Sequence, residues 1–217
     1  MVTCGERLVQ LLEQYDVDTV FGIPGNHTVE LYRGLADSTL RHVSPRHEQG
    51  AGFMADGYAR VSGKPGVCFL ISGPGLTNAM TPMMQALADS VPMLVISAVA
   101  ARHQLGMGEG HLHELPDQRQ LSSQCTRFSH TLMRADELPR VLARAFTVFS
   151  SQRPGPVHIE IPLDVITADA DHLEIGRWPP VAAPAPAASV LNRAATMLAA
   201  ASRPVMVVCG GAVAAAA

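Results

Sequence analysis

The chain has 217 residues, of which 47% are hydrophobic and 16% are charged. A length of this order suits one globular domain with some additional chain, because domains usually span roughly 100–200 residues. The formal net charge is -3 and the sixteen basic residues form no basic stripe, which argues against a nucleic-acid partner.

The chain opens with the pattern of a helix followed by a short strand. Thr3 and Glu6 have the spacing of a capping box, and leucines follow them at helical intervals, so we expect a first helix there. A short apolar strand over residues 18–21 then runs into Gly22-Ile-Pro-Gly25. Glycine and proline interrupt regular structure, and this tetrapeptide is therefore predicted to be an exposed loop.

The same alternation of strand and helix continues along the chain. Continuous apolar strands between amphipathic helices are typical of a parallel sheet that is covered on both faces. The sequence therefore predicts an α/β fold, doubly wound, with a mainly parallel sheet and helices on both faces. The further elements expected are strands at 40–43, 66–71, 93–97 and 157–161 and helices at 49–61, 77–88 and 138–149.

The composition changes near Trp178, where a run rich in proline and alanine begins. Such a run favours extended chain over a packed element. We therefore expect an α/β domain over residues 1–176, a linker over 177–189, and the first helix and strand of a second α/β domain over 190–217, with the strand at 204–209. A lone helix and strand cannot bury their apolar faces, so we expect this second domain to be truncated and the sequence to be a fragment.

Cysteine usage and hydropathy bear on the compartment. The four cysteines are far apart and include no Cys-x-x-Cys pair, and no secretory leader is recognised before them. Neither a disulfide framework nor a zinc site is indicated, and we expect a cytoplasmic protein. The apolar runs are shorter than the roughly 20 residues of a membrane-spanning helix, so no membrane segment is expected.

Five motifs carry the strongest functional signal. They lie within residues 3–167, and together they closely resemble the thiamine-diphosphate-dependent acetolactate synthase and 2-oxo acid decarboxylase family, in that family's order and spacing. Residues 1–176 resemble its N-terminal, pyrimidine-binding domain. The motifs are Gly22-Ile-Pro-Gly25, RHEQGAGFMADGYAR at 46–60, SGPGLTN at 72–78, DSVP at 89–92 and RPGPVHIEIPLDV at 153–165.

The resemblance implies that Glu48 faces nitrogen N1′ of the aminopyrimidine ring of thiamine diphosphate. A proton shared between Glu48 and N1′ would let the exocyclic nitrogen take the proton from C2 of the thiazolium ring, which activates the cofactor. A carboxylate at the start of a helix is also favoured by the helix dipole alone. Glu48 is therefore either the activator of the cofactor or a residue that only stabilises its helix.

Other cofactor contacts are also implied by the resemblance. Gly25 and its neighbour Pro24 would border the cofactor, and Gly73, Thr77 and Asn78 would pack near the pyrimidine ring. A glycine-rich turn between a strand and a helix can instead cradle a phosphate group. Neither complete nucleotide-binding signature is present, which weakens this alternative of a nucleotide-binding domain.

Three residues are candidates for contact with the substrate. Asn26 and His27 follow the Gly22-Ile-Pro-Gly25 loop, where acetolactate synthases have small residues, and His27 could transfer a proton. His113 stands where the family frequently has glutamine. His111 and His113 could also be a pair of metal ligands, but further ligands at a usual spacing are missing, so we expect no metal site in this chain. Exposed loop histidines are the simplest alternative.

The resemblance also implies partners for this domain. In the family, a second domain holds Mg²⁺ and the diphosphate, and the active site forms between two subunits. The Gly-Asp-Gly and Asn-Asn signature of that domain is absent from this sequence. We therefore expect the fragment to be inactive alone and the enzyme to be a homodimer or tetramer. FAD binding, which occurs in acetolactate synthases, stays open.

The predicted substrate is a 2-oxo acid, and the reaction is either carboligation of the acetolactate synthase type or simple decarboxylation. The departures at Asn26, His27 and His113 favour decarboxylation of an unusual, polar 2-oxo acid. A dimerisation or regulatory module that has kept the fold without catalysis is the alternative. The carboxyl group of Glu48 argues against that alternative.

Overall fold

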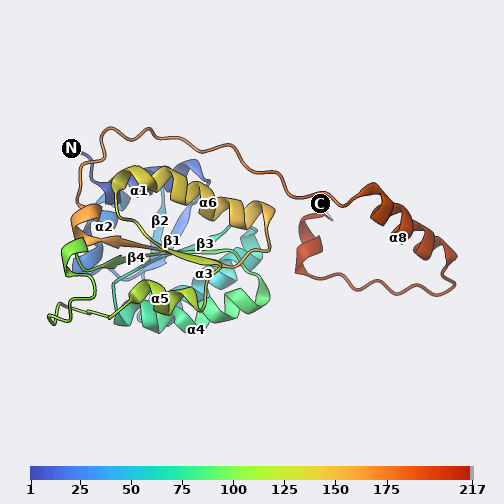
Figure 1. The fold of residues 1–217 in the computed structure, drawn as a ribbon, viewed down its shortest axis with the longest axis horizontal. Coiled ribbons are helices and arrows are strands. Elements are labelled where there is room, and N and C mark those ends of the chain that lie inside the picture. Colours follow the sequence, from blue (N-terminus) through green and yellow to red (C-terminus); the bar gives the residue numbers. More distant parts are fainter. Residues whose placement is uncertain (216–217) are drawn as a thin grey trace.

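The computed structural model of the protein describes residues 1–215, and the side chains of residues 1–212. Its centre is a six-stranded sheet with all pairs parallel and the strand order β2-β1-β3-β4-β6-β5 (Figure 1). The strands are β1 Thr19–Gly22, β2 Arg41–Val43, β3 Gly66–Leu70, β4 Met93–Val99, β5 Phe128–Thr131 and β6 Pro156–Pro162. The α-helices are α1 Cys4–Gln14, α2 Val29–Ala36, α3 Glu48–Ser62, α4 Pro74–Asp89, α5 Gln118–Ser123, α6 Leu138–Ser151, α7 Leu163–Ile166 and α8 Ala188–Ala200.

Helices cover both faces of the sheet, which confirms the predicted fold class. In β3, Val67 and Phe69 point into one core with α1, α2, α6 and α7, while Cys68 and Leu70 point into a second core with α3 and α4. All five residues of β3 are buried. Figure 1 shows α1 and α6 on one side of the sheet and α3 and α4 on the other.

The first helix begins as the sequence predicts. The hydroxyl of Thr3 accepts a hydrogen bond from the backbone N–H of Glu6 at 3.3 Å, and the Glu6 carboxylate accepts one from the Thr3 N–H at 2.7 Å. This reciprocal capping satisfies two N–H groups that the helix itself leaves without partners. The leucines that follow are fully buried against the sheet.

Several elements differ from the prediction. Helix α2, strand β5 and the short helices α5 and α7 lie where the sequence pattern predicts no element. The prediction of a strand at 204–209 is wrong, since these residues form irregular chain. A strand needs a neighbour to pair its backbone groups, and the described residues provide none there.

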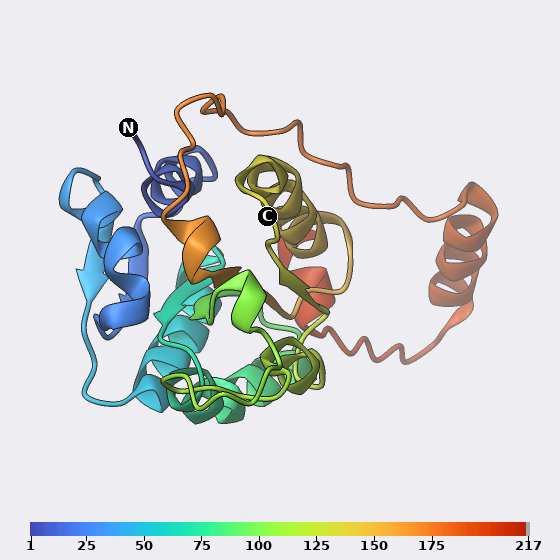
Figure 2. The ribbon, with the colours of Figure 1, turned by 60° about the vertical axis from the view of Figure 1, so that its left-hand side comes forward.

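Irregular chain joins the sheet domain to α8, which begins at Ala188, inside the range 177–189 predicted as a linker. Its first part lies on the end of α1, where Arg177 pairs with Asp16 at 3.0 Å and the N–H of Trp178 donates to the Tyr15 hydroxyl at 3.4 Å. Helix α8 buries none of its residues, and both views show it apart from the sheet (Figures 1 and 2). Within residues 1–215, no helix has the length and apolar character to cross a membrane.

The close packing of β3 against α3 gives a stability prediction. A Cβ atom at Gly66 would lie 2.2 Å from the carbonyl oxygen of Ala55 in α3, so Gly66→Ala forces the helix and the strand apart. We expect the free energy of unfolding to fall by about 1–3 kcal/mol, measured by urea denaturation. Gly176→Ala is the matched control, because a Cβ there meets nothing within 4 Å. Equal effects from the two substitutions would contradict this account.

Candidate active site

The candidate site lies at the carboxyl edge of the sheet. Strands β1 and β3 end at Gly22 and Leu70, and the loops after them carry most of the residues singled out in the sequence. Glu48 reaches the same edge at the start of α3, after β2. Parallel strands present their carboxyl ends together, and ligands of α/β proteins usually bind outside that edge.

Glu48 is the first residue of α3 and is half-buried. The preceding His47 caps the helix, since its ring nitrogen Nδ1 accepts a hydrogen bond from the N–H of Gln49 at 3.1 Å. Glu48 Oε2 accepts a hydrogen bond from Asn78 Nδ2 at 2.9 Å. Within the described part of the chain, Oε1 has no hydrogen-bond partner and no basic side chain pairs with the carboxylate. Two predicted site residues, Glu48 and Asn78, therefore meet, with one carboxylate oxygen left for a ligand.

An apolar surface lies beside this carboxylate. The half-buried side chain of Ile71 fills the space that Cβ atoms would need at Gly25 and Gly75, where they would lie 2.7 Å and 2.4 Å from its carbon atoms. A Cβ at Gly75 would also be 3.7 Å from Glu48 Oε1. Because Gly25 and Gly75 have no side chains, Ile71 packs against their backbone, and its remaining apolar surface next to a carboxylate fits a flat heteroaromatic ring with a nitrogen that can share a proton. These residues could hold the aminopyrimidine of thiamine diphosphate.

His27 and His113 form a second group with Ser72. The Nδ1 atom of His27 lies 2.5 Å from the Ser72 hydroxyl, and the rings of His27 and His113 are 5.9 Å apart between centroids, edge to face. Burial lowers the pKa of His27, and the neighbouring His113 lowers it further. The lowered pKa favours the neutral imidazole, which has one ring nitrogen that accepts a hydrogen bond and one that donates. Nδ1 of His113 is buried and has no partner among the described residues.

Gly73 connects the two groups through its backbone. It adopts a positive φ of 61°, and a Cβ there would lie 2.0 Å from the carbonyl oxygen of His113. Its N–H donates to the side-chain oxygen of Gln118 at 2.7 Å. Gly73 is therefore held between the loop that carries His113 and the start of α5.

The sequence reasoning did not identify Ile71, Ser72 or Gln118 as site residues. In the sequence, Ser72 stands out only as part of the motif at 72–78, and no element is predicted around Gln118. A signal for α5 was present, because Asp117 stands three residues before Gln120 and caps the helix, accepting from its N–H at 2.7 Å. Nothing comparable in the sequence points to the role of Ile71.

The remaining predicted residues contribute less. Pro24 and Asn26 are exposed, and the Thr77 hydroxyl donates to the carbonyl of Pro74 within its own helix at 3.2 Å. In the described residues, Asn26 and Thr77 make no side-chain hydrogen bond to the rest of the site. The sheet edge thus brings Gly25, Glu48, Gly73, Asn78, His27 and His113 together, and leaves Pro24, Asn26 and Thr77 at its margin.

The loop before α5 is organised by Glu114. Its carboxylate accepts hydrogen bonds from the N–H groups of Gly108, Gly110 and His111 at 2.7, 2.8 and 3.0 Å. These bonds lower the pKa of Glu114, the bond from Gly108 most strongly. Across residues 1–215, no group of three or more histidine, cysteine or acidic residues is arranged to hold a metal ion, His111 and His113 included.

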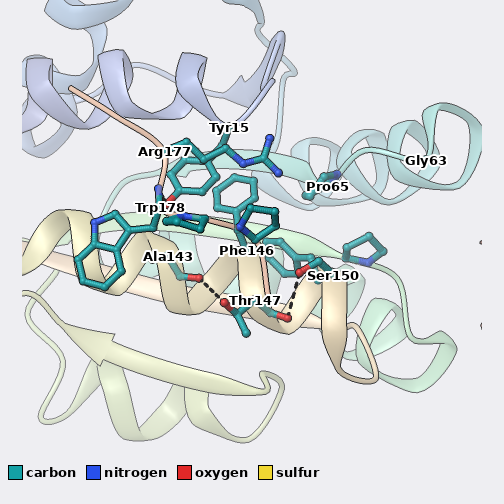
Figure 3. Close-up of a pocket in the computed structure, with 13 residues that line it drawn as sticks. Tyr15, Gly63, Pro65, Ala143, Phe146, Thr147, Ser150, Arg177 and Trp178 are labelled. Atoms are coloured by element: carbon teal, nitrogen blue, oxygen red, sulfur yellow. Dashed lines mark hydrogen bonds between the residues drawn. The ribbon is translucent and has the colours of Figure 1, made fainter. Parts of the chain in front are cut away.

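A separate hollow of about 240 Å³ lies at the opposite edge of the sheet. Its lining includes Pro65 and Pro92, which come just before β3 and β4, so it is remote from Glu48. Figure 3 shows the aromatic ring of Phe146 near Arg177 and Trp178 of the linker. This hollow is the place where the linker crosses α6, and it shares no residue with the candidate site.

Comparisons with known proteins agree with this geometry. Residues 2–121 match the family described as "Thiamine pyrophosphate enzyme, N-terminal TPP binding domain". The probable 2-ketoarginine decarboxylase AruI of Pseudomonas aeruginosa is 56% identical over 99% of this chain and 38% of its own length. The acetolactate synthase isozyme 1 large subunit of Escherichia coli is 40% identical over 96% of this chain and 37% of its own length. The chain therefore spans less than two fifths of these relatives.

Proposed function

The chain belongs to the thiamine pyrophosphate enzymes, through their N-terminal TPP-binding domain, and we propose that it forms the pyrimidine-binding part of a 2-oxo acid decarboxylase. The observation that carries the proposal is Glu48, which offers one carboxylate oxygen beside the exposed part of Ile71 at the carboxyl edge of the sheet. The alternative of a module without catalysis does not explain a half-buried carboxylate in this position.

Thiamine diphosphate, when bound, supplies the carbon nucleophile that adds to a 2-oxo group and accepts the electrons left by CO₂. With the cofactor bound, Glu48 would share a proton between its Oε1 atom and N1′ of the pyrimidine. Asn78 fixes the other carboxylate oxygen, so that Oε1 keeps one direction. Ile71 would support the ring and exclude water there, which would strengthen the hydrogen bond to Glu48.

His27 and His113 face the substrate in this proposal. Decarboxylation to an aldehyde needs a proton at the carbon from which CO₂ departs, and the neutral His27, hydrogen-bonded to Ser72, can relay one. The relative named as a 2-ketoarginine decarboxylase is 56% identical to this chain, against 40% for the acetolactate synthase, which favours a long, polar 2-oxo acid such as 2-ketoarginine. Carboligation of the acetolactate type is the second candidate, supported by those synthase relatives.

We propose that Mg²⁺ and the diphosphate are held outside this domain, in a part of the enzyme corresponding to the rest of the relatives' length. The described residues fit the pyrimidine end of the cofactor and provide no metal cluster. A reducing compartment such as the cytoplasm suits Cys4, Cys68 and Cys125, which are buried thiols rather than disulfides.

We also propose that a second copy of the chain covers α3 and α4. These helices pack against each other and expose large apolar side chains, with Phe53, Met54 and Met84 each 44–47% exposed. Groups of exposed apolar residues commonly mark interfaces. Met84→Lys should shift the sedimentation profile of the full-length protein towards monomer, whereas Ile175→Lys, at a residue 47% exposed just before the linker, should not. A wild-type protein that sediments as an active monomer would refute the interface.

The role of Glu48 is tested by Glu48→Gln in the full-length enzyme. We expect turnover to fall by about 10²–10⁴-fold, because the amide cannot share a proton with N1′. Glu30→Gln is the matched control, since Glu30 also lies in the first turn of a helix but pairs with Arg33. If Glu48 only stabilised its helix through the helix dipole, both variants would keep their turnover and would lose a similar free energy of unfolding.

The substrate is tested with a panel of 2-oxo acids on the full-length enzyme, with CO₂ release and products measured. We expect 2-ketoarginine to give the highest kcat/KM and an aldehyde product. Pyruvate should react slowly, because its methyl group makes none of the polar contacts that a long, polar side chain would make. Rapid formation of acetolactate from pyruvate, with no aldehyde from other substrates, would instead establish the carboligase.

A further inference from the structure

A buried polar network lies behind the substrate-facing histidines. It joins α5 to β4, β5 and β6, and its central members are Gln118, Ser97, His158 and Glu160, which are at most 3% exposed. Polar groups this deeply buried cost free energy unless every one is hydrogen-bonded. None of these four residues has a place in the proposed chemistry, which raises the question of what the network supports.

Gln118 is the link between this network and the site. At one end of its amide, Oε1 accepts the hydrogen bond from the Gly73 N–H at 2.7 Å. At the other end, Nε2 lies 3.1 Å from the Ser97 hydroxyl, 3.0 Å from the Ala98 carbonyl and 3.0 Å from Glu160 Oε2. The side chain also lines a water-sized hollow of about 10 Å³ together with Ser72 and His113.

The surroundings allow only one orientation of this amide. The Ala98 carbonyl can only accept hydrogen bonds, and the Gly73 N–H can only donate one. Reversing the amide would therefore bring oxygen against the Ala98 carbonyl and nitrogen against the Gly73 N–H. The acceptors behind it are also held, because Ser97 is bonded to His158 at 2.8 Å and the Ala98 carbonyl belongs to the buried strand β4. The network thus holds the Gln118 oxygen in place.

The position of Gly73 matters on the substrate side of the site. The residue before it, Ser72, contacts His27, and the carbonyl of His113 passes so close to Gly73 that no side chain would fit. A shift of Gly73 would displace both histidines. The Glu48 group is less sensitive to such a shift, because Asn78 lies a full turn into α4 and donates its hydrogen bond to Glu48 from there.

We infer that Gln118 is a positioning residue, which fixes Gly73 and thereby sets the arrangement of His27, Ser72 and His113 that faces the substrate. The kinetic part of this inference rests on the proposed function. The geometric part does not, because it concerns the environment of His27 in the protein without substrate.

The geometric part is tested by NMR titration of the histidine rings in the 217-residue chain. In Gln118→Met, the Gly73 N–H loses its partner and the loop over His27 loosens. We expect the His27 pKa to rise towards its ordinary value as water reaches the ring, and the ring to lose its fixed tautomer. Gln118→Asn keeps an amide, but its side chain is one methylene too short to reach both the Gly73 N–H and the acceptors behind it. This variant replaces Gln118→Met in the titration if the methionine variant fails to fold.

The matched control is Thr131→Val. This change removes a different hydrogen bond to Glu160 and leaves all the contacts of Gln118 in place. It should lower the melting temperature without moving the His27 titration. If Thr131→Val moves that titration as far as the Gln118 variants do, or if folded Gln118 variants leave it unmoved, Gln118 is an ordinary core residue and the inference is wrong.

The kinetic part uses the full-length enzyme. Gln118→Asn should raise KM for the preferred 2-oxo acid about tenfold, which equals about 1.4 kcal/mol, and leave the affinity for thiamine diphosphate unchanged. An equal loss of cofactor affinity would overturn the inference. If His27 responds in the NMR experiment but the wild-type enzyme decarboxylates no 2-oxo acid, the proposed function fails while the positioning role of Gln118 stands.

Discussion

The turn from β3 into α4 at Gly73 is the constraint on which the site depends. The backbone there has a positive φ and passes so close to the His113 carbonyl that only glycine fits. Around this point the chain places Ile71 against Gly25 and Gly75 and brings Ser72 to His27. One turn further on, Asn78 reaches Glu48. A parallel sheet buried on both faces makes this arrangement possible, because it brings loops that are distant in sequence to a single edge.

Much of the fold could be predicted because its signals are local. The capping box of α1, the apolar strands β3, β4 and β6, and the helices with a regular apolar stripe depend on nearby residues, and they appear where predicted. Strand β5 was missed because its residues Phe128–Thr131 are only half-buried and polar in part. The strand at 204–209 was wrong for the opposite reason, since an apolar run forms a strand only where another strand pairs with it.

The site residues likewise divide into those with a local sequence signal and those without one. Glu48 and Asn78 could be named from motifs, and the structure joins them by a hydrogen bond. Gln118 could not be named, because its contacts with Gly73 and Glu160 bridge 45 and 42 residues of sequence. Sequence patterns report the periodicity of one element, whereas a buried amide is explained only by the acceptors and donors that the fold brings around it.

The two halves of the site are supported by separate parts of the fold. The Glu48 half rests on the starts of α3 and α4 and on the bare backbone around Ile71. The histidine half rests on α5, on the Glu114-organised loop and on the polar network in β4 and β6. Under the proposed function the histidine half faces the substrate, and a change at His27 or His113 would leave the hydrogen bond between Glu48 and Asn78 in place. We therefore propose that the loop and its buried support can change with the substrate while the Glu48 half is kept, within a family whose relatives are named as decarboxylase and as acetolactate synthase.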